Sequence, residues 1–301
     1  LAKKKNITTT GKSHALLAKE LDIRTIHISG RDTQMSSIPK KMNEYCNTWS
    51  SDGECYYEEA LGCVEMSIGT HENSQYSNQI YRNKGYAIFD RKGLDTYAQS
   101  YLPYYGRYIG QIIRHDEAYT IGKNLEVFNN NELIYKPSVY YVYHPTNESR
   151  MSIEELKERN YKYQDKWRLL TDDIIQGRDI LGLTFYLGNG EIYWIGSLLD
   201  INESRDIFEN KMDEFVNATN TQVVAGFLSG IFQLIEMSKN NIYKGLMVPE
   251  DLDYNKAFQV QELFLGKFEF TKIDEKFEKY SSKFIKNKDE KNRYILTDFL
   301  I

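Results

Sequence analysis

Aromatic rings and carboxylates gather in residues 49–59. Trp49 precedes Tyr56 and Tyr57, and four Asp or Glu residues, Glu59 among them, lie in the same segment. The face of an indole ring attracts an ammonium or guanidinium group, and carboxylates neutralise its charge. The segment therefore carries the chemistry that a diamine site needs. The pattern also fits a solvent-exposed Glu59, because this residue lies off the apolar side of the helix expected here.

A histidine and a glutamate form a second candidate group. His115 and Glu117 are two residues apart in a segment that reads as a strand, so their side chains would share one side. Such a pair can place a proton donor beside an acceptor or orient an imidazole. The same spacing also fits a structural histidine at a strand end.

Asp179 lies just before a predicted hairpin. The pattern there fits either a turn residue or a site carboxylate and does not decide between them.

Composition excludes several classes of protein. The 301 residues contain 38 Lys and Arg against 43 Asp and Glu, so the net charge of −5 argues against nucleic acid as a partner. Aromatic residues make up 14% of the chain, which provides enough apolar surface for a folded core. The longest apolar stretch, residues 223–235, is too short to cross a membrane. The three cysteines, Cys46, Cys55 and Cys63, lack the spacing of a zinc site, so we expect no metal and a cytoplasmic location.

The hydrophobic pattern predicts an α+β fold with a mixed or antiparallel sheet. Strands and helices alternate without regular βαβ units. A helix is expected to open at Thr10 or Gly11, and the helix at 152–160 has a capping-box start at Ser152. The long helix at 216–237 is apolar on most faces and is expected to be buried. The other predictions are strands at 24–29, 86–90, 105–114, 117–121 and 138–144, a loop at 30–42, helices at 55–66 and 252–264, and a hairpin at 181–199 that turns at Asn189-Gly190.

An ordered set of short segments resembles bacterial homospermidine synthase, a family of the saccharopine dehydrogenase-like superfamily. The segments fall in the family's order, with similar spacing, across about residues 1–270. They include Arg31-Asp-Thr-Gln34, Asn47-Thr-Trp-Ser50, Glu59-Ala-Leu, His115-Asp-Glu117, Tyr193-Trp-Ile-Gly-Ser197 and Asn217-Ala-Thr.

The resemblance implies a reaction. Enzymes of this family use bound NAD to oxidise putrescine to an imine, release ammonia, let a second amine attack, and return the hydride to give homospermidine. The implied substrates are diamines, putrescine and as a further amine spermidine. The implied fold has an N-terminal Rossmann domain followed by a catalytic domain whose sheet covers the cofactor and contributes to a homodimer.

The resemblance also implies roles for the candidate residues. Trp49 matches an aromatic residue that holds the diamine, and Asp179 matches an acidic residue at the pocket edge. Glu59, His115 and Glu117 match catalytic residues of the same pocket. Amines are cationic when bound and neutral when they react, so nearby carboxylates and an imidazole must exchange protons with them.

Two departures from the family stand out. Gly30 occupies a position where the family has Glu, which would weaken the site for the second amine or change the substrate. The family's Rossmann half and its glycine-rich turn have no counterpart, so the cofactor-binding residues stay unknown and we expect a fragment of a longer polypeptide. The expected division is a catalytic domain at 1–209, a helical segment at 210–270 that packs towards the cofactor domain, and a charged helical segment at 271–301.

Two alternatives stay open. One is another saccharopine-dehydrogenase-like oxidoreductase of polyamine or amino-acid metabolism. A carboxylated substrate would need a cationic pair, for which Arg31, Arg114 and Arg168 are available. The other is a non-catalytic polyamine-binding or dimerisation module.

Overall fold

The computed structural model describes residues 1–49, 54–72, 79–83, 85–209, 215–240, 242, 245–274 and 294–301. Within these ranges no helix is long and apolar enough to span a membrane. The same ranges contain no group of three or more His, Cys, Asp or Glu side chains arranged to hold a metal ion.

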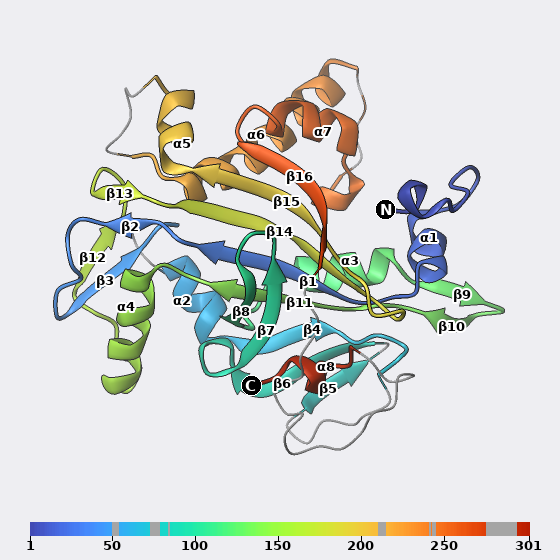
Figure 1. Ribbon diagram of the computed structural model, residues 1–301, viewed down its shortest axis with the longest axis horizontal. Helices are drawn as coiled ribbons and strands as arrows, with labels where there is room; N and C mark the ends of the chain where they lie inside the picture. The colour runs from blue at the N-terminus through green and yellow to red at the C-terminus, as the bar shows by residue number, and fades with distance from the viewer. Residues whose placement is uncertain are drawn as a thin grey trace.

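A ten-stranded mixed sheet forms the centre of the molecule (Figure 1). Its middle strand, β1 (Ile23–Asp32), pairs in parallel with β11 (Ser138–His144) and antiparallel with β14 (Arg178–Leu187). Beyond β14 come β15 (Ile192–Asp200) and β16 (Lys267–Ile273), and beyond β11 come β4 (Cys63–Ser67), β6 (Tyr86–Lys92) and β5 (Gln79–Asn83). The predicted α+β class and mixed sheet are confirmed, as are the strands at the middle of the sheet and the hairpin of β14 and β15.

The last two of the ten strands, β7 (Tyr97–Leu102) and β8 (Gly106–Gln111), form a hairpin that joins the sheet where β8 pairs with β11. This hairpin crosses in front of β1 and β11 in Figure 1. It covers one face of the sheet, while α2 (Glu54–Leu61), α3 (Glu117–Asn124) and the start of α6 (Ala218–Lys239) lie at the other. The remaining elements are η1 (Lys3–Lys5), α1 (His14–Glu20), β2 (Met35–Ser36), β3 (Glu44–Asn47), η2 (Gly93–Asp95), β9 (Val127–Asn129), β10 (Glu132–Tyr135), α4 (Asn147–Glu158), β12 (Lys166–Leu169), β13 (Ile174–Gln176), α5 (Ile201–Ile207), η3 (Pro249–Asp251), α7 (Tyr254–Gln261) and α8 (Leu296–Phe299).

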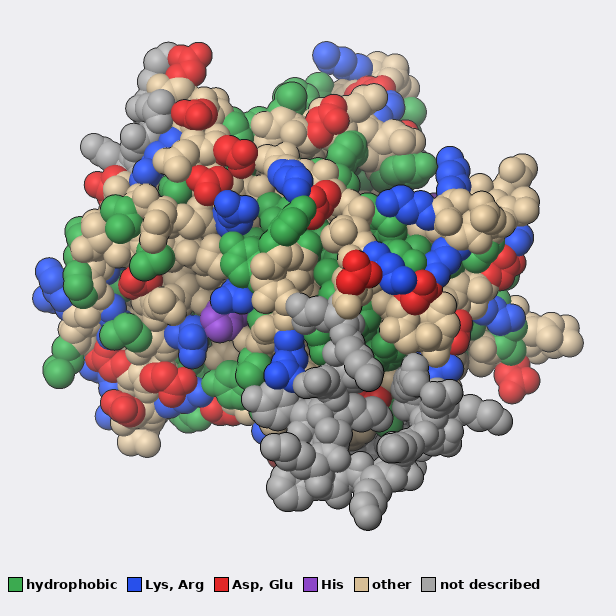
Figure 2. Space-filling view, in the orientation of Figure 1, with side chains coloured by type: hydrophobic (Ala, Val, Ile, Leu, Met, Phe, Trp, Pro, Cys, Tyr) green, Lys and Arg blue, Asp and Glu red, His purple; other side chains and the backbone are tan. Residues whose placement is uncertain are grey.

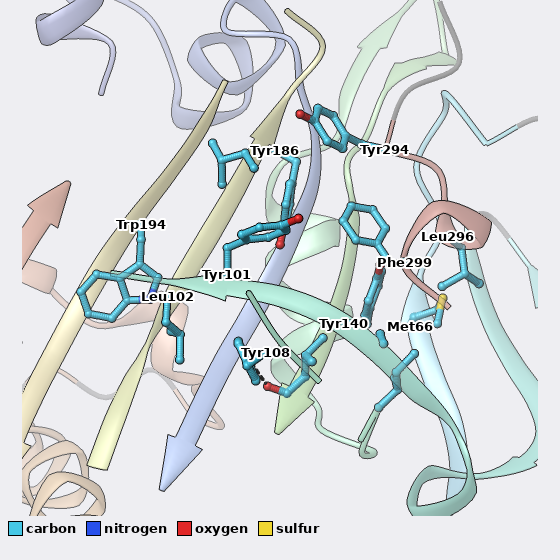
Figure 3. Close-up of a cluster of buried hydrophobic side chains, with 14 of the residues drawn as sticks. Met66, Tyr101, Leu102, Tyr108, Tyr140, Tyr186, Trp194, Tyr294, Leu296 and Phe299 are labelled. Carbon is cyan, nitrogen blue, oxygen red and sulfur yellow. Dashed lines mark hydrogen bonds between the residues drawn. The ribbon is translucent and has the colours of Figure 1, made fainter. Parts of the chain in front are cut away.

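The main core lies between the sheet and the β7–β8 hairpin and is rich in tyrosine (Figure 3). His27 of β1 is fully buried there, with its ring centre 4.5 Å from those of Tyr140 and Phe299. Trp194 donates from Nε1 to Ser29 Oγ at 3.1 Å. This packing fixes one face of β1, so the side chains that alternate with His27 and Ser29 point to the opposite face.

The predicted strand at 117–121 is wrong, because these residues form the first part of helix α3. Its buried positions, Ala118 and Gly122, are four residues apart, which is a helical spacing. A Cβ at Gly122 would lie 2.1 Å from Ser67 Oγ, so glycine permits the close approach of α3 to β4.

Three helix boundaries also differ from the predictions. Helix α2 ends at Leu61, and after Gly62 the burial alternates along strand β4, so the helix expected to reach residue 66 is too long. Helix α4 starts after Thr146, which caps Ser149 N, while the Ser152 hydroxyl bonds back to the carbonyl of Glu148 instead of capping. Helix α1 is capped by Ser13, not by Thr10 or Gly11.

Helix α6 forms as predicted, but its expected burial is wrong. Phe227 is 68% exposed, and no described residue has an atom within 4 Å of a Cβ placed at Gly226. The helix instead buries small and polar side chains, because Ser229 and Gln233 hydrogen-bond to the α7 region. Its large apolar side chains therefore remain on the surface.

The expected division of the chain stays a prediction. Its boundary at residue 270 falls inside β16, which pairs with β15 from Ile192 to Ser197. Most of the charged segment expected at 271–301 lies outside the described residues.

Candidate functional site

All five residues predicted for the site line one cavity of about 480 Å³. They come from separate parts of the chain, namely Trp49, Glu59, His115, Glu117 and Asp179. The cavity lies on the face of β1 opposite the tyrosine-rich core, because Ile28 and Gly30 alternate with the buried His27 and Ser29. The fold therefore brings the candidates together, while their roles stay predictions.

His115 links the two glutamates of the site. Its Nδ1 is hydrogen-bonded to the Glu117 carboxylate, and its Nε2 lies 3.8 Å from Glu59 Oε1. The imidazole ring packs on Tyr141 of β11 with ring centres 4.8 Å apart. The prediction that His115 and Glu117 share one side of a strand is wrong, because they flank the start of α3. They still meet, since a side chain just before a helix reaches its first turn.

The surroundings of this group shift its protonation. Burial raises the pKa of Glu59 to about 7, although the nearby His115 acts in the opposite direction. Burial alone would lower the pKa of His115, but its hydrogen bond with Glu117 and the charge of that carboxylate outweigh burial and raise it. The pKa of Glu117 is lowered because the contact with His115 outweighs burial. Near neutral pH, Glu59 can therefore take up or release a proton beside an ion pair.

A second acidic group lies across β1 from the first. Asp179 of β14 pairs in register with Asp32 of β1, and the two residues are only 5% and 2% exposed. Asp32 accepts hydrogen bonds from Thr48 Oγ1 at 2.7 Å, Thr219 Oγ1 at 2.9 Å and the backbone N–H of Gln34 at 2.9 Å. Burial raises the pKa of Asp179 well above its usual range, and the charge of Asp32 adds to this shift.

Trp49 follows a firmly held segment. The side-chain amide of Asn217, the N-cap of α6, donates to the carbonyls of Thr48 and Leu170 at 2.8 Å each. Trp49 N donates to Asn47 Oδ1 at 2.8 Å. These contacts place the indole at the cavity, and residues 50–53, which follow it, lie outside the described residues.

Gly30 lies in the wall between two tyrosines. A Cβ at this position would come 2.9 Å from Tyr143 Cδ2 and 3.1 Å from the Tyr141 hydroxyl. Burial raises the pKa of both tyrosines well above the usual range, so their hydroxyl groups stay protonated. Glycine at this position thus leaves room for the rings of Tyr141 and Tyr143 to pack against β1, where a larger side chain would collide with them.

Sequence reasoning missed four residues of this site: Asp32, Tyr141, Tyr143 and Thr219. Asp32 fell in a segment read as a loop, whereas β1 continues to Asp32. The alternation of β1, continued past residue 29, would have placed Gly30 and Asp32 on the cavity face. Tyr141 and Tyr143 lie on a strand that was predicted. The sequence did not show that their side chains face the cavity, because that depends on which face of the sheet packs against the core.

Comparison with known proteins confirms the resemblance inferred from the short segments. The chain is 32% identical over 265 residues to a homospermidine synthase of Blastochloris viridis, a match that covers 86% of this chain and 53% of the relative. It is 31% identical over 257 residues to that of Mesorhizobium japonicum, covering 84% of this chain and 51% of the relative. No protein-family model matches the chain.

The fold is also shared with a solved structure. The homospermidine synthase of Legionella pneumophila, determined in complex with NAD, superimposes with a TM-score of 0.88 at 30% identity. That match covers all of this chain and 65% of the Legionella chain. The present chain is thus a homologue of homospermidine synthases that spans about half the length of the curated relatives it matches.

Proposed function

We propose that the protein carries the catalytic centre of an NAD-dependent homospermidine synthase. The observation that carries this proposal is the arrangement of two acidic groups on two sides of one cavity, with Trp49 beside them. Asp179 lies on β14, and the group of Glu59, His115 and Glu117 lies beyond β11, with β1 between them. A diamine carries an ammonium group at each end, so both ends find carboxylates.

Each residue of the site has a separate role in binding the amine or in moving its protons. Asp179 binds one ammonium end, and the indole of Trp49 attracts it through its ring face. Glu59, with a pKa of about 7, takes a proton from the amine that must react in its neutral form. In the His115–Glu117 pair, the imidazole of His115 places a positive charge near Glu59. This charge favours the ionised form of the Glu59 carboxylate, which can then accept a proton. The same group returns a proton to the nitrogen that leaves as ammonia.

The cavity has an apolar side that fits the nicotinamide of NAD. Ile28 and Leu183 lie in register on β1 and β14, and Ile121 and Val223 line the same cavity. These four side chains carry no charge and would hold the flat ring. NAD held by these side chains would supply the acceptor for the hydride of the amine-bearing carbon and the hydride donor for the condensed product.

The cavity disfavours a carboxylated substrate. Among the described residues that line it, none is Lys or Arg. Arg114 lines an adjoining cavity with Glu59, His115 and Glu117, but it is paired with Glu65 at 3.0 Å. Arg168 is paired with Glu44 at 3.3 Å and with Asp173. Arg31 lines a different cavity on the opposite face of the sheet. The alternative of an oxidoreductase for amino-acid substrates thus lacks its cationic pair.

We further infer a cytoplasmic homodimer from the same resemblance. Two of the three cysteines, Cys46 and Cys63, are free thiols, which suits a reducing compartment. The net negative charge of the chain disfavours nucleic acid and suits cationic amines.

Product analysis tests the proposed function. The polypeptide of the native reading frame is incubated with putrescine and NAD, and homospermidine and ammonia are measured by mass spectrometry and by an ammonia assay. Release of both products in equal amounts supports the proposal. A protein that binds putrescine but forms neither product would instead be a polyamine-binding module.

A further inference from the structure

A second cavity of about 480 Å³ opens on the opposite face of the sheet. It lies where the ends of β1 and β11 meet β8 and the first turn of α4. We call it the Arg31 cavity, after the residue at its base. On the face drawn in Figure 2, blue Lys and Arg side chains gather around a purple histidine in the region of these elements.

Strand register sets two basic side chains side by side in this cavity. Arg31 and His144 are partners in the parallel pairing of β1 and β11. Paired residues of neighbouring strands project to the same face, about 5 Å apart. One step back along β1, Gly30 lines the cavity of the candidate active site, while Tyr143 and Pro145 line both cavities. The two cavities therefore lie on opposite faces of β1 and adjoin at the end of β11.

Charge in the Arg31 cavity is strongly unbalanced. Among the described residues, three guanidinium groups line it, from Arg31, Arg107 and Arg150, and one carboxylate, from Glu154. Glu154 also lies 3.4 Å from Lys157 Nζ, which neutralises part of its charge. With His144 neutral, the three guanidinium groups and one carboxylate of the described lining give the cavity a charge of +2.

One donor in the cavity is left without an acceptor. The Nε atom of Arg31 is buried and finds no hydrogen-bond partner among the described residues. The guanidinium lies over the ring of Tyr105, with Cζ 5.1 Å from the ring centre, so the ring fixes its plane. A buried N–H without an acceptor is costly, which points to a group that accepts from it.

The pKa of His144 depends on the charge of this cavity. Its Nδ1 is hydrogen-bonded to the carbonyl of Ile109 at 2.7 Å. Burial lowers its pKa, and the charges of Arg150 and Arg31 lower it further. An anion that screens the two arginines would raise this pKa. The other titratable groups that line the cavity are those of Tyr97, Arg107, Tyr108, Tyr143 and Glu154.

We propose that the Arg31 cavity binds a dianionic phosphate group. The net charge of the lining matches a dianion, and planar guanidinium groups match the oxygens of phosphate through paired hydrogen bonds. Arg150 stands in the first turn of α4, a helix of 12 residues, whose N-terminal N–H groups add to the positive potential. The volume exceeds that of a phosphate ion, so a small phosphate monoester fits as well as the free ion. This inference does not depend on the proposed amine chemistry.

Phosphate titration with the whole chain tests the proposal. Inorganic phosphate and phenyl phosphate are added at constant ionic strength, with chloride as the balancing anion, and the histidine ring signals are followed by NMR. His144→Gln identifies the His144 signal. We expect saturable binding of both probes and a rise in the pKa of His144. Tighter binding of phenyl phosphate would identify a monoester as the ligand, and equal binding would identify the ion itself.

Variants locate the binding. Arg31→Gln and Arg150→Gln should each weaken phosphate binding about ten-fold or more, as expected for a lost charged hydrogen bond. Arg24→Gln is the matched control, because Arg24 lies at the other end of β1 and faces Asp22 at 3.4 Å. Arg150 is exposed on α4, so its variant keeps the test valid if Arg31→Gln fails to fold. The absence of saturable binding, or an equal effect of Arg24→Gln, overturns the proposal.

Discussion

Asp32 and Asp179 are partners across β1 and β14, and both are buried, but they have unequal surroundings. Thr48, Thr219 and Gln34 all donate to Asp32. Asp179 lines the cavity, and its pKa is raised well above the usual range by burial and then by the charge of Asp32. Burial raises the pKa of Asp32 as well, but the hydrogen bonds that Asp32 accepts act in the opposite direction and favour its charged form, so a proton shared by the pair favours Asp179.

Asp32→Asn should move the acidic limb of the pH profile for diamine use. Without the neighbouring charge the pKa of Asp179 falls, so Asp179 stays ionised at lower pH. We expect the acidic limb of kcat/KM for putrescine to shift down by about one pH unit. At high pH the same variant should bind putrescine more weakly, because one negative charge is lost. A loss of activity with an unchanged profile would make Asp32 structural only.

Trp49→Ala should weaken diamine use about ten-fold or more. A desolvated cation–π contact contributes about 2 kcal/mol. We expect Trp49→Phe to retain part of the effect, since its ring also presents a face to the cation. Steady-state kinetics with putrescine compare the three proteins. Unchanged kinetics in Trp49→Ala would remove this residue from the site.

Glu59→Gln should slow turnover and remove the ionisation near pH 7 from the rate profile. Burial raises the pKa of Glu59 to about 7, and glutamine cannot accept a proton. Because its folded pKa is raised, Glu59 favours folding most below about pH 4.5, and this contribution is lost as pH rises towards 7. The melting temperature of the variant at pH 8 should therefore equal or exceed that of the wild type. A large drop in melting temperature would mean that Glu59 is structural.

Glu117→Gln should lower the pKa of His115. The wild-type contact raises the pKa of His115 and lowers that of Glu117. The Glu117 contribution to stability is present above its usual pKa of 4.5 and is lost as pH falls through its lowered value. The His115 contribution is present below its usual pKa of 6.5 and is lost as pH rises through its raised value. Urea unfolding should thus show the largest difference between the proteins between about pH 4.5 and 6.5. A constant difference from pH 3 to 9 would contradict this.

Gly30→Ala should raise KM for putrescine. The added methyl would lie 2.9 Å from Tyr143 Cδ2, so this ring must move into or away from the cavity. Gly226→Ala is the matched control, because no atom of the part of the chain that the structure describes lies within 4 Å of a Cβ there, and Ala favours the helix. We expect the control to leave KM unchanged. Equal KM values for both variants would show that the tyrosine pair does not shape the substrate site.

The sequence predicted the middle of the sheet well, and the reason lies in local composition. Strand β11 was predicted at residues 138–144, which consist mainly of Tyr and Val, residues that favour strands. The strand predicted at 117–121 failed because Tyr119, Thr120 and Ile121 favour strands locally, and only the packing of Ala118 and Gly122 selects a helix. Local preference could not show that packing.

The sequence predicted which residues form the site better than it predicted how they are arranged. Glu59, His115 and Trp49 were found from residue type and family resemblance, and the fold places them around one cavity. Asp32 was missed because its segment was read as a loop instead of the end of β1. Its pairing with Asp179, which lies 147 residues later in the chain, is a long-range contact that no local pattern reports. The exposure of α6 was missed because apolar composition alone does not say which face a neighbour covers.

The most direct test of the proposed chemistry follows the hydride. Putrescine that carries deuterium on both amine-bearing carbons is incubated with the native polypeptide and NAD in ordinary water. If NAD takes the hydride and returns it within one active site, the homospermidine formed retains all of the deuterium, and reduced NAD does not accumulate. Homospermidine that has lost deuterium, or reduced NAD that accumulates without homospermidine, would contradict the proposal.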